Sequence, residues 1–183
     1  MNMKKIFTIA IMMMLVLNMS AQQGITTFLG IPVDGSKTLF IQKVKAKGFE
    51  QDTKDNSLNG MFEGRPVTIK VFTDNGKVSR VMVIDSESTR DVMEIVDKYN
   101  GLIDTYRERP DLTEYESNPY IRDAEAAIHM RFIHEGFYYA EFFQRNDPEL
   151  YSRVMSFKIS DEKGDYRIIT CFDNIYNLPK GGE

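Results

Sequence analysis

Hydrophobic positions along the chain follow three patterns. An unbroken apolar run covers residues 6–17. Apolar residues recur every three to four positions over 36–49 and 88–108, and apolar and polar residues alternate over most of the rest. The alternating runs are 58–64, 66–73, 77–85, 126–134, 136–145, 151–160 and 165–173. This order predicts an α+β fold, in which a curved antiparallel β-sheet of about seven strands carries two main helices packed on one face.

Each helical pattern has recognisable ends. Ser36 is placed to cap the shorter helix, and Gly48 to end it in the left-handed conformation. Ser88 is placed to cap the longer helix, which closes before Pro110. We expect the apolar stripe of the longer helix to lie on the sheet. The stripe consists of Val92, Ile95, Val96, Tyr99, Leu102, Ile103 and Tyr106.

The strand patterns also indicate how strands are connected and which of their side chains face the core. Asn75-Gly76 predicts a tight turn that joins 66–73 to 77–85 as an antiparallel hairpin. The second of these strands is apolar on both faces, which favours a central position in the sheet. Residues 110–125 are polar and are predicted to form a connector. In 151–160, alternation predicts that Met155, Phe157 and Ile159 face inward.

The first 21 residues have the pattern of an export signal. Lys4 and Lys5 precede the apolar run, and small residues follow at Ser20 and Ala21. The run is shorter than the about 20 residues that span a bilayer. We therefore expect a signal peptide at 1–21 and a single α+β domain at 22–183, in the periplasm or secreted.

Charge and cysteine content narrow the expected class of protein. The whole chain has 23 basic and 27 acidic residues, and without residues 1–21 it has 21 and 27, a net charge of −6. Without a basic cluster, nucleic acid and anionic membranes are poor partners. Cys171 is the only cysteine, so we expect no internal disulfide and no lipid anchor. Inside its alternating run, Cys171 is expected to be a small buried apolar residue.

No pattern of catalytic or cofactor-binding residues is found. GIPVDGSKT, residues 30–38, resembles a phosphate-binding loop, but one extra residue separates its second glycine from the lysine. We interpret it as the entry to the first helix. His129 and His134 are five residues apart in a predicted strand, so they face opposite sides and cannot share a metal ion. We therefore expect a protein that is not an enzyme and has no cofactor or metal.

The aromatic run FYYAEFF, residues 137–143, is the strongest candidate for a binding surface. An unpaired glutamate rarely faces a core, so Glu141 places its own side of the strand on the face opposite the helices. Exposed aromatic residues beside arginine are typical of binding hot spots. The candidate binding residues are Tyr139, Phe143, Glu141, Arg131 and His129. The alternative is that the connector or the C-terminal tail covers these aromatic side chains.

Two stretches of the chain resemble each other. EGRPVTIKVFTDNGKVSRVM begins at Glu63, and EGFYYAEFFQRNDPELYSRVM begins at Glu135. They share EG and SRVM with one inserted residue, a match that chance can also produce. Their equivalent positions favour a duplicated α-β-β-β unit over 30–87 and 88–176.

The stretches LGIPVDGSKTLFIQKVKAKGF, LNGMFEG and VSRVMVID resemble a family of short exported bacterial proteins of unknown function. The element order resembles the β-lactamase-inhibitor-protein-like architecture, whose tandem α-β units put helices on one side of a curved sheet. The resemblance implies that the other side is left for a partner. Inhibition of β-lactamase does not carry over, because the disulfides of that inhibitor are missing here.

These observations predict a non-catalytic module that recognises an envelope or extracellular protein or peptide on the open face of the sheet. Two alternatives stay open. A carrier would enclose an apolar pocket for a lipid or glycan between the sheet and the long helix. A structural component of the envelope would need neither a partner-binding face nor a ligand pocket.

Overall fold

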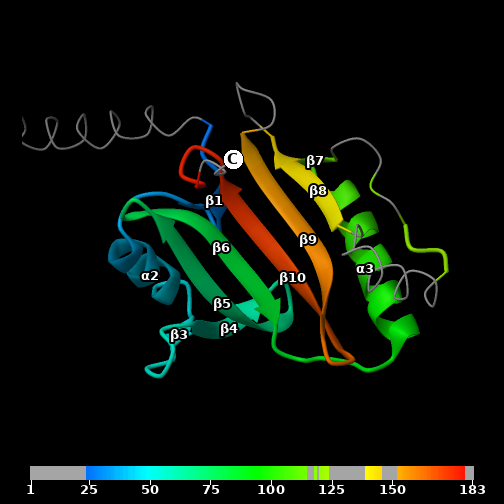
Figure 1. Ribbon diagram of the computed structural model, residues 1–183. Helices are drawn as coiled ribbons and strands as arrows, with labels where there is room; N and C mark the ends of the chain where they lie inside the picture. The colour runs from blue at the N-terminus through cyan, green and yellow to red at the C-terminus, as the bar shows by residue number, and fades with distance from the viewer. Residues whose placement is uncertain (1–23, 115–117, 119, 124–138, 146–151, 180–183) are drawn as a thin grey trace, which may run out of the picture.

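The computed structural model describes residues 24–114, 118, 120–123, 139–145 and 152–179. They form one antiparallel sheet of eight strands in the order β3-β4-β5-β6-β10-β9-β8-β7, and a separate two-stranded sheet (Figure 1). The strands of the large sheet are β3 (Glu50–Gln51), β4 (Leu58–Phe62), β5 (Arg65–Asp74), β6 (Lys77–Asp85), β7 (Leu112–Glu114), β8 (Tyr139–Gln144), β9 (Arg153–Glu162) and β10 (Asp165–Asn174). The small sheet pairs β1 (Thr27–Phe28) with β2 (Ile31–Pro32).

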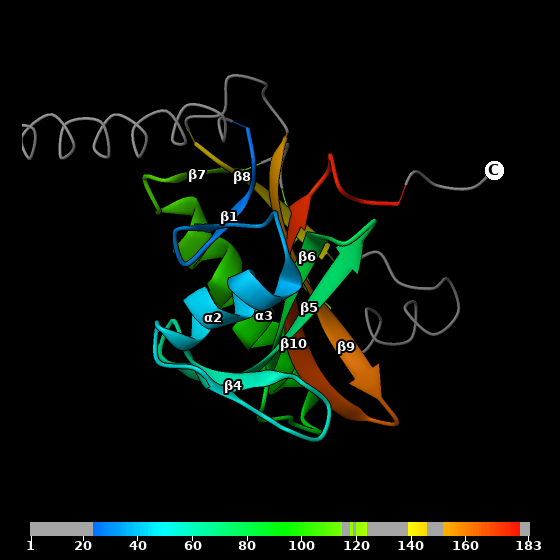
Figure 2. The ribbon, with the colours of Figure 1, turned by 90° about the vertical axis from the view of Figure 1, so that its left-hand side faces the viewer.

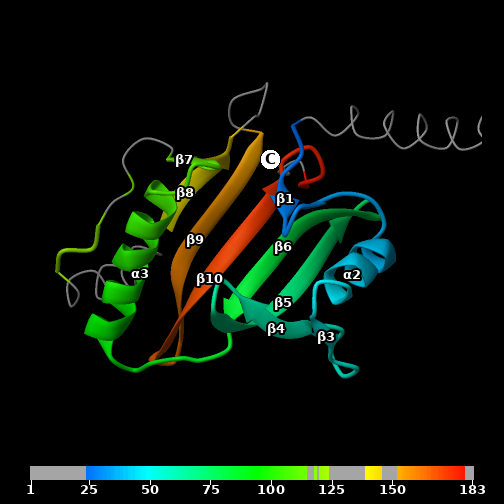
Figure 3. The same ribbon diagram turned by 180° about the vertical axis from the view of Figure 1, so that it is seen from behind.

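Both main helices pack on the same side of the large sheet (Figures 2 and 3). Helix α2 (Lys37–Lys45) lies against β5 and β6, and helix α3 (Val92–Arg107) lies against β9 and β10. The predicted α+β class, antiparallel sheet and two helices are confirmed. Neither described helix combines the length and apolarity needed to cross a membrane.

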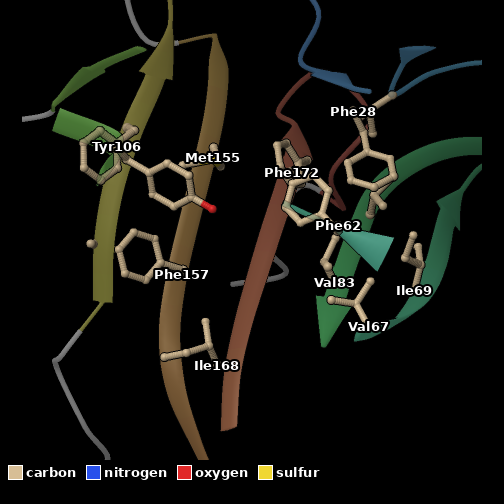
Figure 4. Close-up of a cluster of buried hydrophobic side chains, with 14 of the residues drawn as sticks. Phe28, Phe62, Val67, Ile69, Val83, Tyr106, Met155, Phe157, Ile168 and Phe172 are labelled. Carbon is tan, nitrogen blue, oxygen red and sulfur yellow. The ribbon is translucent and has the colours of Figure 1, made fainter. Parts of the chain in front are cut away.

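The core between helices and sheet contains two aromatic groups (Figure 4). Phe28, Phe62 and Phe172 pack together with ring centroids 5.1–6.0 Å apart. Under α3, Phe157 lies 5.3 Å from Tyr99 and 5.5 Å from Tyr106. The inward facing of Met155, Phe157 and Ile159 is confirmed, because all three are buried. The stripe on α3 is confirmed as core, with Val92 and Leu102 only partly buried.

The helix ends confirm one predicted cap and correct another. The Ser36 hydroxyl accepts a hydrogen bond from Leu39 N at 3.3 Å, and Gly48 has φ +97°. The cap of α3 is Asp91 rather than Ser88, and its carboxylate accepts from Met93 N at 2.8 Å. A carboxylate interacts more favourably than a hydroxyl with the positive end of the helix dipole. Thr89 is also held in a β-bridge with Tyr166, so the helix begins after it.

The strands agree with the predicted hairpin and correct the predicted connector. Asn75 and Gly76 have φ values of +47° and +78°, as a hairpin turn of this kind requires, and β6 is central. The connector 110–125, in contrast, contains strand β7, which pairs with β8 at the edge of the sheet. Three residues are too few to show alternation, so pairing rather than pattern defines this strand. The predicted strand 126–134 lies outside the described residues.

The two halves of the chain have the same element order. Among the described elements, a helix precedes four strands in each: α2 before β3 to β6, and α3 before β7 to β10. The last strands of the halves, β6 and β10, pair at the centre of the sheet, and the earlier strands follow outward in reverse order. This arrangement is what a duplication would produce, and the duplication stays a prediction.

Candidate binding surface

The candidate surface is the side of the large sheet that faces away from α2 and α3, here called the open face. Its side chains come from β5, β6, β10, β9 and β8, in that order across the sheet. Strand register arranges them in three rows. The first row is Thr68, Ile84, Ile169, Lys158 and Tyr139. The second is Lys70, Met82, Cys171, Ser156 and Glu141, and the third is Phe72, Arg80, Asp173, Val154 and Phe143.

Strand β8 presents three of the candidate residues on this face. Tyr139 is 50% exposed, whereas Glu141 and Phe143 are half-buried. Ala140 and Phe142, between them, are fully buried, so the facing inferred from Glu141 is confirmed. The remaining candidates, His129 and Arg131, lie outside the described residues, and their position beside β8 stays a prediction.

Asn118 holds the outer edge of β8 at Glu141. Its side-chain oxygen accepts from Glu141 N at 2.8 Å, and its side-chain nitrogen donates to the Glu141 carbonyl at 3.1 Å. The amide thus takes the place of a neighbouring strand where β7 has ended. Burial raises the pKa of the Glu141 carboxyl, and the nearby charge of Asp173 adds to this effect. The candidate acid is therefore rigidly placed and partly desolvated.

An ion pair that the sequence did not reveal lies in the third row. Arg80 on β6 donates to both carboxylate oxygens of Asp173 on β10, at 2.5 and 2.8 Å. The hydrogen bond to Asp173 raises the pKa of Arg80. Within the described part of the chain, the third guanidinium nitrogen, Nη1, has no hydrogen-bond partner. Bidentate pairing fixes the orientation of the Arg80 guanidinium and leaves Nη1 outside the pair.

The middle of the open face is apolar. Met82, Ile84 and Ile169 are half-buried and adjacent across β6 and β10, and Cys171 lies opposite Met82. The expectation that Cys171 is a buried core residue is therefore wrong. Alternation in β10 turns Ile168, Thr170 and Phe172 toward the core instead. Partial burial still raises the pKa of its thiol to about 11, which makes it a poor nucleophile near neutral pH.

Slow thiol labelling of Cys171 is an expected consequence. With the pKa moved from 9.0 to about 11, the thiolate fraction at pH 8 is about 100-fold lower than for an ordinary thiol. Labelling by a disulfide reagent should be at least about tenfold slower in the folded protein than in urea, and should accelerate as the pH rises toward 11. A Lys77→Cys, Cys171→Ser variant supplies an exposed thiol as control. Equal rates for the two thiols would contradict the expectation.

The other side of the sheet carries a small cleft of about 250 Å³, between the β4–β5 turn, the end of α3 and β1. Its charged groups bind one another: Arg109 pairs with Glu63 at 2.5 Å and with Asp111 at 2.6 Å. Tyr106 donates to Glu63 at 2.6 Å. These bonds join α3 to the β4–β5 turn, so the groups are engaged in holding the fold together.

Metal-binding chemistry has no support in the described ranges, where no three histidine, cysteine, aspartate or glutamate side chains gather. The open face can instead provide apolar contact, aromatic contact at three of its corners and an oriented guanidinium. A scan against protein-family models matches none, and searches of curated proteins and of solved structures find no match either.

Proposed function

We propose that this protein is an exported, non-catalytic module that binds a protein or peptide on its open face. One observation carries the proposal: half-exposed apolar and aromatic side chains extend across five strands beside an oriented arginine, and no described helix covers them. Protein interfaces are enriched in aromatic residues, methionine and arginine in this way. The β-lactamase-inhibitor-protein-like resemblance implies the same use of the helix-free side.

The proposal of export rests on the pattern of residues 1–21, and the described chain after it is held by contacts that do not involve those residues. The Gly24 carbonyl accepts a hydrogen bond from Ser152 at 2.7 Å, and Thr27 N donates to the Gln144 side chain at 2.8 Å. Removal of residues 1–21 leaves both contacts intact. From the pattern of residues 1–21, we propose that the mature protein resides in the periplasm or outside the cell.

A carrier of a lipid or glycan receives less support. Such sites commonly enclose about 300–1,000 Å³ of mostly apolar space. In the described residues, Tyr99, Tyr106, Phe142 and Phe157 fill the space between α3 and the sheet. Two clefts lie on that side: one of about 250 Å³ is lined by paired charges, and one of about 390 Å³ beside α2 is lined mostly by polar side chains. Native mass spectrometry that detects a small molecule bound to the purified protein would favour the carrier instead.

Affinity capture from the native envelope tests the proposal through matched variants. A Tyr139→Ala, Met82→Ala, Phe72→Ala variant removes contact area from two corners and the centre of the open face. We expect it to lose the partner that the unmodified protein captures. Leu39→Ala with Met93→Ala removes similarly exposed apolar side chains from the two helices, and should capture as before. Retention of the partner by the first variant would refute the proposal, provided that both variants melt cooperatively.

A further inference from the structure

Three cations on the open face are not paired with acids. Lys70 and Lys158 are exposed and Arg167 is half-buried, and none of them forms an ion pair with a described residue. The Nε atom of Arg167 is buried without a hydrogen-bond partner. Five arginines of the described chain, in contrast, do have acidic partners. Those with partners are Arg65, Arg80, Arg90, Arg107 and Arg109.

These cations flank the apolar centre of the open face. Lys70 lies opposite Met82, and Lys158 lies between Ile169 and Tyr139 in the first row. Arg167 is two residues from Ile169 on the same strand and faces the same side. Lys70 and Lys158 are three strand spacings apart, about 14 Å, so they border the two sides of the centre. That width accommodates one helix or one pair of extended strands.

Among the described residues, no acid on the open face forms an ion pair with these cations. Asp173 is already bound to Arg80, and Asp165 to Arg90. The hydrogen bond from Arg90 lowers the pKa of Asp165, and the charge of Arg167 still contributes to this shift. Hydrogen bonds from Ser57 lower the pKa of Asp55, and the charge of Lys70 contributes there. Glu141 stands at the far end of the second row, and Glu162 at the hairpin end of β9. Counting only the side chains that the structure describes, the strip around the apolar centre is therefore cationic, although the whole chain has a net charge of −4. Complementary charge selects a partner and speeds its association.

We infer that the partner segment bound on the open face is an acidic, amphipathic peptide. Its apolar side chains pack on Met82, Ile84 and Ile169, and its carboxylates pair with Lys70, Lys158 and Arg167. This inference rests on the proposed function and adds the chemistry of the partner. Nucleic acid fits less well, because the cations are spread around an apolar centre rather than concentrated along a phosphate track.

Two synthetic peptides test the inference by fluorescence anisotropy with the full chain. Both are 16-residue amphipathic helices with the same leucines; one has glutamate and the other lysine at the flanking positions. We expect the glutamate peptide to bind at least about tenfold more tightly at low salt, and the difference to shrink as salt rises. Lys70→Glu with Lys158→Glu should reverse the preference. Lys37→Glu, on α2 at the other side of the sheet, is the matched control and should preserve it.

Equal binding of the two peptides, or a preference that survives Lys70→Glu with Lys158→Glu, would overturn the inference. So would the absence of binding to either peptide. The proposed function is judged separately, by whether Tyr139→Ala, Met82→Ala, Phe72→Ala abolishes capture of the native partner. If both peptides bind equally and this variant loses both, the open face is a binding site without a preference for acidic partners.

Discussion

Phe157→Ala is expected to lower the free energy of unfolding by about 3–5 kcal/mol, because it opens a cavity in the middle of the core. Phe157 is 1% exposed. Its ring contacts Tyr99 and Tyr106 on α3, and it stacks with Phe142 on β8 at a centroid distance of 6.2 Å. No small movement can close this space, since α3 and β8 both rest on the same ring. Urea unfolding followed by circular dichroism measures the loss.

Phe72→Ala is the matched control for Phe157→Ala. Phe72 is on the open face and is 43% exposed, so its truncation should cost less than about 1 kcal/mol. A loss of about 3–5 kcal/mol is a large part of the stability of a typical domain, and the variant can unfold outright. Phe157→Leu retains much of the apolar volume and should show an intermediate loss. Equal effects of Phe157→Ala and Phe72→Ala would show that the two rings are equally buried in solution.

Asp85→Ala is expected to lower the free energy of unfolding by about 3 kcal/mol, because it removes a buried carboxylate that neutralises Arg65, which is mostly buried, and Lys98, which is partly exposed. Asp85 ends β6 and is 3% exposed. One carboxylate oxygen accepts from Arg65 Nη1 at 2.8 Å, and the other lies 2.8 Å from Lys98 Nζ. The carboxylate thus joins the start of β5 to α3. Thermal and urea unfolding of the variant measure the effect.

Two further variants test whether the loss of stability comes from leaving charges uncompensated in the interior or from breaking an ion pair of any kind. Asp165→Ala breaks the exposed pair with Arg90 and should leave the unfolding midpoint almost unchanged. Asp85→Leu combined with Arg65→Met replaces two charged partners with apolar side chains, and should recover part of the loss. Lys98 can then turn its ammonium toward solvent. If Asp85→Ala is as harmless as Asp165→Ala, the buried network does not hold α3 on the sheet.

Local features of the fold could be predicted because neighbouring residues determine them. The stripe from Ile95 to Tyr106 follows from helical spacing, and the hairpin turn follows from Asn75-Gly76, which tolerates positive φ. The cap of α3 was wrong by three residues, because two adequate capping residues occur close together. The β-bridge between Thr89 and Tyr166, which is 77 residues further along the chain, decides between Ser88 and Asp91.

The candidate surface could be predicted only in part. The side of the sheet on which Tyr139 and Phe143 lie could be predicted, because Glu141 was expected to avoid the core and alternate residues of a strand face the same side. The Arg80–Asp173 pair joins residues 93 positions apart, and only the register between β6 and β10 brings them together. The same holds for the cations around the apolar centre, since each of them alone is an ordinary surface residue in its own strand.

By itself, the sequence determined which segments are helices or strands, where most of them turn, and which side of most strands is apolar. Those properties depend on backbone preference and on side-chain period, which act over a few residues. Only the tertiary structure decided the strand order, the short edge strand β7 and the combination of charges on the open face. Pairing between distant strands decides these features, and the free energy of that pairing comes from contacts that no single segment contains.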